Sequence, residues 1–232
     1  MYRADADRNW KLEHPHEPKG ELSSTTVRAH QRWVAAGRRG EGKLELEHVE
    51  AREARVGAAD LTAVRMLDVD LSGAKLEAAK FDEAELSDVK LDGAGLDSSS
   101  FRGARIEGGS FRRARMSVAK FDRARLSGTD FTGADLEQSR WERTHVEGAT
   151  FASVRFGDAS LDHTELVRCN SRGASFASIL NAVTPPITRG TRFVDCDLRD
   201  TDWARRDLTD ATFVRCKLAA RTARRPSSTR SA

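Results

Sequence analysis

The chain has 232 residues, of which 38% are hydrophobic and 32% are charged, and its formal net charge is +3. This small net charge alone argues for neither a nucleic-acid binder nor an acidic mimic of nucleic acid. No apolar run approaches the ~18 residues that a membrane-spanning helix needs. The polar start of the chain has no apolar signal segment, so a cytoplasmic location is expected.

Residues 1–22 are polar and contain Pro15 and Pro18, which predicts an irregular N-terminal arm. His14 and His16 flank the first of these prolines. Two histidines without a third ligand do not make a metal site, so no metal is expected there.

Residues 23–43 predict a capping helix and a lead-in to the rest of the chain. A serine at position 23 or 24 suits the start of the helix, and Gly37 suits its end. His30 and Trp33 fall on this helix. We expect them to cover the first turn of the structure that follows, because an uncovered end would expose unpaired backbone groups. A small-molecule site at these two residues is the alternative.

From residue 44 onward the chain repeats with a period of five residues. Between Leu61 and Phe176, 24 positions are spaced by five; 23 of them are apolar, and Ser171 is the exception. The residue two places before each is small, and 13 of these 24 are alanine. A helix buries positions 3.6 apart and a strand alternates by two, so neither fits. A strict short period of this kind predicts a solenoid.

Each pentapeptide fits one side of a square coil, with the large and the small residue pointing inward and the others facing water. Coils stacked at ~4.8 Å would bring residues four repeats apart into contact and build ladders of large side chains. The small residue is needed because four sides meet in a narrow interior. The predicted core residues are Leu61, Leu76, Phe81, Phe101, Phe111, Phe121, Phe131, Trp141, Phe151, Phe156, Phe176 and Phe193.

The repeated pattern resembles that of the pentapeptide-repeat family, with good copies at 58–61 (Ala-Ala-Asp-Leu), 73–76 (Gly-Ala-Lys-Leu) and 133–136 (Gly-Ala-Asp-Leu). The resemblance covers about residues 44–218. It implies an all-β solenoid, a right-handed quadrilateral parallel β-helix, preceded here by a short N-terminal capping α-helix. It is specific for fold and weakly specific for function.

The main solenoid is predicted over 44–178, and the register then breaks. Residues 179–190 contain two prolines, which cannot join a backbone ladder, and predict an extruded loop. Repeats resume over 191–218, and residues 219–232 predict a basic disordered tail. The loop is either a tolerated insertion or a partner-binding element. Its candidate contact residues are Ile179, Leu180, Val183, Pro185, Pro186 and Ile187.

The three cysteines, Cys169, Cys196 and Cys216, all occupy small inward positions. The main interpretation is three small buried thiols, which favours the cytoplasm. A disulfide or metal pair between Cys196 and Cys216, one coil apart, is the alternative.

Outward charges are unevenly distributed. Residues 51–100 hold 11 acids and 6 bases, whereas residues 101–150 hold 7 acids and 10 bases. A candidate acidic strip in the first coils consists of Glu77, Asp82, Glu83, Asp92 and Asp97. The basic residues that follow it are Arg102, Arg112, Arg113 and Arg123.

No catalytic motif occurs in the sequence, so neither an enzyme nor a cofactor is expected. We expect a protein-binding scaffold of unknown partner. The alternative that the resemblance implies is a DNA mimic that binds DNA gyrase or another type II topoisomerase and protects it from inhibitors. Direct binding of nucleic acid through the arginines is a third, weaker hypothesis. A homodimer through Phe213 and Leu218 is expected, because no covering helix is predicted after them.

Overall fold

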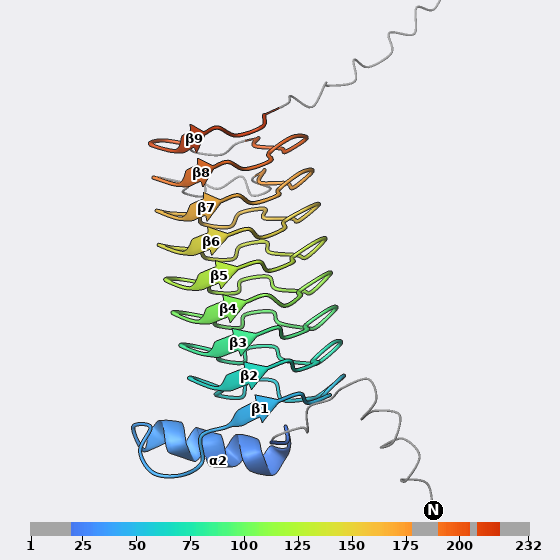
Figure 1. The fold of residues 1–232 in the computed structure, drawn as a ribbon, viewed down its shortest axis with the longest axis vertical. Coiled ribbons are helices and arrows are strands. Elements are labelled where there is room, and N and C mark those ends of the chain that lie inside the picture. Colours follow the sequence, from blue (N-terminus) through green and yellow to red (C-terminus); the bar gives the residue numbers. More distant parts are fainter. Residues whose placement is uncertain (1–19, 178–189, 205–207, 219–232) are drawn as a thin grey trace, which may run out of the picture.

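The computed structural model describes residues 20–177, 190–204 and 208–218. It is a rod of stacked coils with one helix against its first coil (Figure 1). The predicted extruded loop and basic tail, and most of the predicted N-terminal arm, lie outside the described residues.

The helix α2 (Ser24–Ala35) begins where the serine cap predicts. The Ser23 hydroxyl accepts a hydrogen bond from the Thr26 amide, and the Thr26 hydroxyl accepts one from the Ser23 amide. These reciprocal bonds satisfy backbone donors that a helix start otherwise leaves unpaired. At the other end the Gly37 amide donates to the Val34 carbonyl over 3.0 Å, and Gly37 adopts a φ of 71° that favours glycine.

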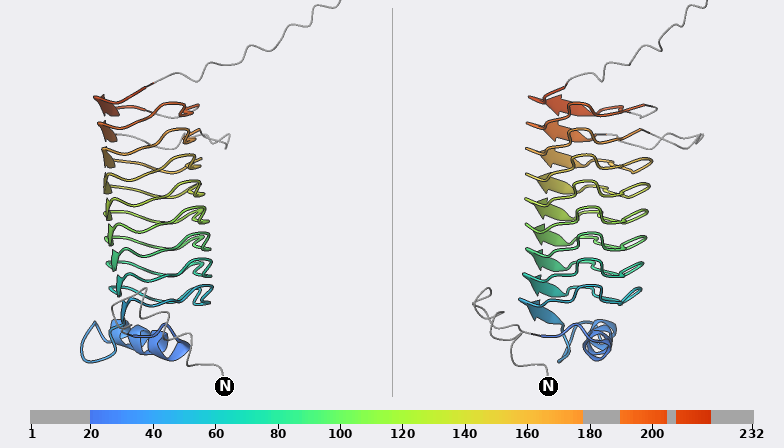
Figure 2. Two further views of the ribbon diagram at one scale, coloured as in Figure 1. Left: turned by 45° about the vertical axis from the view of Figure 1, so that its right-hand side comes forward. Right: turned by 90° about the vertical axis from the view of Figure 1, so that its right-hand side faces the viewer.

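Nine short strands stack along one side of the rod, which we call the strand side. They form one parallel sheet in sequential order, as Figure 2 shows from two directions. The strands are β1 (Glu45–Glu47), β2 (Arg65–Leu67), β3 (Glu85–Ser87), β4 (Arg105–Glu107), β5 (Arg125–Ser127), β6 (His145–Glu147), β7 (Glu165–Val167), β8 (Arg192–Val194) and β9 (Thr212–Val214).

The other three sides are joined from coil to coil by single parallel bridges. Glu50 pairs with Asp70, Arg55 with Lys75 and Asp60 with Lys80, and the same columns continue up the rod. Together with the strand side they give four pentapeptide sides per coil. The fold is therefore the quadrilateral parallel β-solenoid that the period predicts.

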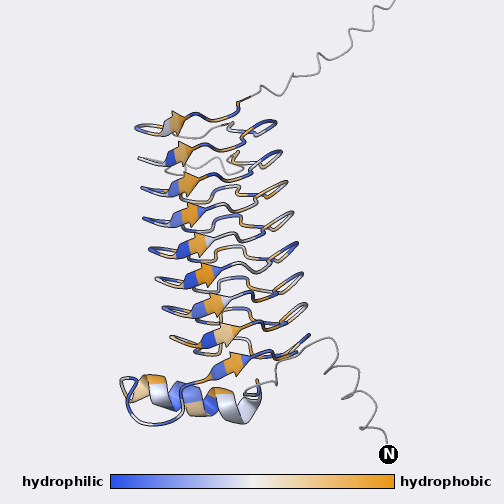
Figure 3. Cartoon of the chain, viewed as in Figure 1, coloured by the Kyte–Doolittle hydropathy of each residue, from blue (hydrophilic) through white to orange (hydrophobic). Residues whose placement is uncertain are grey.

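The interior is filled from end to end by the large and small inward residues. All twelve predicted core side chains have 0–1% of their surface exposed. Phe81, Phe101, Phe121 and Trp141 stack as one ladder, with ring centroids 4.9, 5.0 and 4.1 Å apart. Phe101 also meets Phe111, in a second ladder, edge to face at 6.0 Å. In Figure 3 hydrophobic residues recur in the stacked strands from β1 to β9.

Each coil turns its corners with a left-handed residue two places after the large inward one. Glu83, Val118 and Arg123 occupy such corners, with φ of 59°, 62° and 61°. Glycine fills the same corner at positions 73, 93, 103, 108, 128, 133, 148 and 173. Non-glycine residues pay about 1–2 kcal/mol in this conformation, so many corners are held against local preference by the stacked coils.

The coil between β7 and β8 is longer than the others. Glu165 pairs with Arg192, 27 residues on, whereas Glu85 pairs with Arg105, 20 residues on. The coils on both sides of the insertion keep their stacking, because Ser175 pairs with Asp202 and Trp203 stacks on Phe176 at 4.1 Å. The stacking of the described coils therefore continues across the insertion.

Candidate functional site

Because the interior is packed with side chains, the outward residues are the candidate site. Their order follows from the repeat: residues one coil apart sit directly above one another. Three features stand out on this surface: the helix against the first coil, the paired acids, and the cations without partners.

His30 ties the helix to the first coil. Its side chain is fully buried, its Nδ1 accepts a hydrogen bond from the Leu44 amide at 2.9 Å, and its Nε2 lies 3.0 Å from the Thr62 carbonyl. Because Nδ1 accepts, Nε2 carries the proton and donates to that carbonyl. Burial lowers the pKa of His30, which favours this neutral form.

The hydrogen bonds of His30 take the place of those that a preceding coil would make with the first coil. Inside the rod, the Ala63 amide donates to the Asp82 carbonyl of the next coil. The Thr62 carbonyl, in the first coil, instead receives the His30 proton. Trp33 stacks on His30 with ring centroids 5.4 Å apart. This arrangement supports the capping role expected for the two residues, because it pairs a backbone group that a bare coil end would leave unsatisfied.

The five residues of the candidate acidic strip lie on three sides of the rod. Asp82 and Glu83 lie on one side, Asp92 on a second, and Glu77 and Asp97 on a third. They therefore do not form one continuous strip.

Three of these acids form ion pairs with arginines of the same chain. Glu83 pairs with Arg38 at 2.6 Å, which lowers the pKa of Glu83. Glu77 and Asp97 both pair with Arg115, at 3.3 and 3.5 Å. Exposed ion pairs of this kind contribute about 0–1 kcal/mol each.

Aspartates that follow a large inward residue bind the coil above. Asp82 accepts hydrogen bonds from the Ser100 hydroxyl and, at 3.0 Å, from the Arg102 amide. Asp92 does the same with Ser110 and the Arg112 amide. The carboxylates therefore hold neighbouring coils together, a role that the repeat pattern alone does not reveal.

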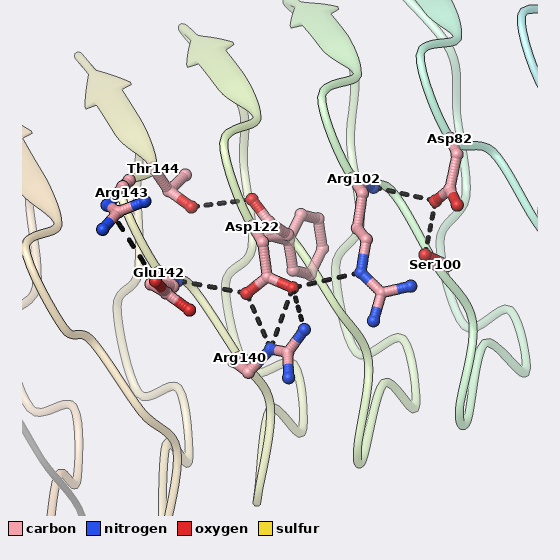
Figure 4. A network of polar contacts seen from close by, with 9 residues as sticks. Asp82, Ser100, Arg102, Asp122, Arg140, Glu142, Arg143 and Thr144 are labelled. Atoms are coloured by element: carbon pink, nitrogen blue, oxygen red, sulfur yellow. Dashed lines mark hydrogen bonds and ion pairs between the residues drawn. The ribbon is translucent and has the colours of Figure 1, made fainter.

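The densest polar network surrounds Asp122, whose side chain is almost buried (Figure 4). Its carboxylate accepts from Arg140 at 2.8 and 2.5 Å, from Arg102 at 3.2 Å, and from the Glu142 amide at 3.3 Å. One aspartate thus links two arginines, one from the coil below and one from the coil above.

Of the basic residues singled out in the sequence, Arg102 and Arg112 are paired, Arg112 with Asp130 at 2.6 Å. Arg113 and Arg123 are exposed, and neither has an ion-pair partner within the described part of the chain. Two further exposed arginines, Arg105 and Arg125, share this property. Sequence analysis missed these two, because their significance depends on the pairing of neighbouring coils.

The cysteines form an inward column. The pairing of Asn170 with Asp197 and of Asp197 with Lys217 places Cys169, Cys196 and Cys216 on successive coils. All three are free thiols, and their Sγ atoms donate to backbone carbonyls. A hydrogen bond to Cys196 and burial both raise the pKa of Cys169. No group of three or more potential metal ligands occurs among the described residues.

Phe213 and Leu218 lie on the last described coil and are 36% and 62% exposed. The predicted partner loop, with Ile179 and its neighbours, falls outside the described residues. No helix within the described ranges is long and apolar enough to cross a membrane.

The fold and its surface define a parallel β-solenoid scaffold, and comparison with known proteins identifies its family. Models described as pentapeptide repeats match residues 70–108, 99–138 and 119–165. Residues 70–165 therefore carry the repeat of the pentapeptide-repeat family. No curated protein sequence matches the chain significantly.

Three solved structures illustrate the likeness. A trypsin-treated form of QnrB1, a plasmid-mediated fluoroquinolone resistance protein, is 18% identical with a TM-score of 0.51, covering 76% of this chain and 90% of that one. A pentapeptide repeat protein from the Arabidopsis thaliana thylakoid lumen is 26% identical over 48% of this chain and 71% of that one, with a TM-score of 0.34. HetL from Nostoc sp., involved in heterocyst differentiation regulation, is 20% identical over 81% and 90%, with a TM-score of 0.24. The likeness to QnrB1 concerns the fold.

Proposed function

We propose that the protein is a non-enzymatic scaffold that binds a protein partner along its outer sides. The supporting observation is the filled interior: the large inward side chains are buried and their rings touch from coil to coil, so the chemistry of the chain lies on its surface. A rigid rod presents such a surface with little conformational entropy to lose on binding. Its free thiols favour a cytoplasmic location.

Site-specific photo-crosslinking in cells tests this function. A photoreactive residue is placed in turn at Lys75, Lys80, Glu85 or Lys90, which are exposed and lie one on each side of the rod. We expect one crosslinked protein band from one side and none from the others, because a partner covers a defined face. If no position gives a band above background, the scaffold function is contradicted.

A second candidate function is protection of DNA gyrase or another type II topoisomerase from fluoroquinolones. The similarity in fold to a fluoroquinolone resistance protein supports it. The pairing of Glu77, Glu83 and Asp97 with arginines weighs against an acidic surface of the DNA-mimic kind. A gyrase supercoiling assay with and without a fluoroquinolone tests it. Rescue of the drug-treated enzyme is expected; neither inhibition nor rescue at micromolar protein would remove the candidate.

We further propose that a second copy covers the last described coil. Phe213 and Leu218 expose apolar surface there, next to the outer edge of β9. Burying an apolar side chain contributes about 1.5–3 kcal/mol, so pairing two such ends is favourable. Light scattering should give the mass of two chains, and Leu218→Glu should halve it. The mass of one chain at micromolar concentration would rule the dimer out.

A further inference from the structure

The first residues of strands β1 to β8 alternate in charge along the strand side, except from β4 to β6. The residues that begin successive strands run Glu45, Arg65, Glu85 and Arg105, each pairing in register with the next. Arg105 is then followed by a second arginine, Arg125, also in register.

The alternation resumes only at Glu165, because His145, which comes next in the ladder, is not an acid. His145 follows Arg125, and its Nδ1 lies 3.1 Å from a carboxylate oxygen of Glu165. Arg192, in the next strand, pairs with Glu165 at 2.9 Å. Like charges directly opposite each other destabilise a sheet. The pair of Arg105 and Arg125 is therefore a cost to the fold that the rest of the ladder avoids.

A third arginine adjoins this pair. Arg123 is exposed at the corner that leads into β5, two residues before Arg125. The side chains of these three arginines have no hydrogen bond or ion pair within the described part of the chain, although their backbone amides join the ladder between coils. We call Arg105, Arg123 and Arg125 the arginine patch.

Acids bound the arginine patch on several sides. Glu85 precedes it along the ladder, and Glu165 follows beyond His145. Glu107 lies two residues after Arg105, at the far edge of the strand. A long polyanion such as duplex DNA, laid along the rod, would meet these acids in both directions and be repelled. A short anionic segment would contact the arginines alone.

We propose that the arginine patch binds a short acidic segment of a protein partner through its carboxylates. Arginine guanidinium groups suit this role, because they bind carboxylates through two parallel hydrogen bonds. The bound carboxylates would supply the negative charge that the strand ladder lacks at this point. This proposal rests on the scaffold function proposed above and names the chemistry of its partner.

A binding assay with a fluorescein-labelled oligoglutamate peptide tests the proposal. The double variant Arg105→Ser with Arg125→Ser should weaken binding about tenfold or more, since close charge pairs carry much of such affinity. The matched control is Arg65→Ser with Arg192→Ser, which removes two arginines of the same ladder that already have partners in Glu47 and Glu165. The control should bind the peptide as the unchanged protein does.

A charge reversal separates binding from folding. Arg125→Glu restores the alternation and should raise the melting temperature by about 1–2 °C, while abolishing peptide binding. A variant that folds better and binds worse cannot be explained by damage to the structure.

Three outcomes would overturn the proposal: no peptide binding by the unchanged protein, equal binding by all variants, or tighter binding of duplex DNA through the same arginines. If photo-crosslinking finds a partner and the arginine variants still crosslink to it, the scaffold function is supported and the proposed role of the arginine patch is rejected. If crosslinking finds none, the scaffold function itself falls.

Discussion

The central coils and the last described coil are built from the same repeat but differ in burial. Phe121, in the middle, is fully buried and stacks between Phe101 and Trp141. Phe213, in the last described coil, stacks on Phe193 at 5.1 Å, has no stacked ring on its other face among the described residues, and is 36% exposed. We therefore expect a pentapeptide side to be most stable when coils cover it on both faces, because each repeat of a solenoid contacts only its neighbours.

The start of the rod solves the same problem with a helix. There His30 supplies the donor that a preceding coil would have supplied to Thr62. Within the part of the chain that the structure describes, no helix follows β9. The first coil is therefore covered by a helix, whereas the last described coil is not, and substitutions at the two ends should have different effects on stability.

The largest expected effect is the difference in lost stability between a substitution in a central coil and one in the last described coil. Phe121→Ala should lower the free energy of unfolding by about 3–5 kcal/mol, because it opens a cavity between two stacked rings. Phe213→Ala is the matched control and should cost about 1–2 kcal/mol, since its ring is partly solvated. Denaturant unfolding measures both. Equal losses would contradict the difference between the two regions.

Removing the histidine at the first coil should be nearly as costly. His30→Ala leaves the Leu44 amide and the Thr62 carbonyl without their partners and should lower the free energy of unfolding by about 2–4 kcal/mol. Arg28→Ala, on an exposed turn of the same helix, serves as the control and should be neutral. A neutral result for His30→Ala would show that the helix is not held by these bonds.

Acid should weaken the same end. Because burial lowers the pKa of His30 below its ordinary 6.5, the unfolded chain binds this proton more readily than the folded chain. Stability is then complete above about pH 6.5 and is lost as the pH falls below it, by at most about 1.4 kcal/mol per pH unit. Unfolding of the native chain and of His30→Ala at pH 7.5 and 5.5 tests this. The gap between them should narrow in acid; a constant gap counts against it.

The smallest effect concerns the corners. Val118 is a β-branched residue at a φ of 62° and is 42% exposed. Val118→Gly should raise the free energy of unfolding by about 0.5–1 kcal/mol, because glycine adopts this conformation without strain. Ser117→Gly, one residue earlier, should instead destabilise, since it only adds freedom to the unfolded chain. Loss of stability in Val118→Gly would mean that the corner is not strained.

The five-residue period was enough to predict the solenoid, its four sides and its aromatic ladders, because inward positions such as Phe101 and Phe121 are set by the repeat alone. The left-handed corners were not predicted, since only scattered glycines such as Gly73 and Gly133 mark them. The bonds of His30 escaped prediction because Leu44 and Thr62 are far from it in sequence.

The surface was the least predictable part. Residues that look like an acidic strip in sequence, such as Asp82 and Asp92, fall on different sides and bind the coil above. Cys169 is the neighbour of Cys196 because Asn170 pairs with Asp197 across the long coil, 27 residues on instead of 20. Charge partners depend on what lies one coil away, and sequence order does not display that directly.

Hydrogen exchange measured along the whole chain by mass spectrometry tests the central claim most directly, namely that coils are stable when covered on both faces. Among the coils that the structure describes, we expect the slowest exchange in residues 81–161 and the fastest in residues 208–218, with protection of the latter rising at concentrations where a dimer forms. Uniform protection from β1 to β9 in a single chain would contradict this account.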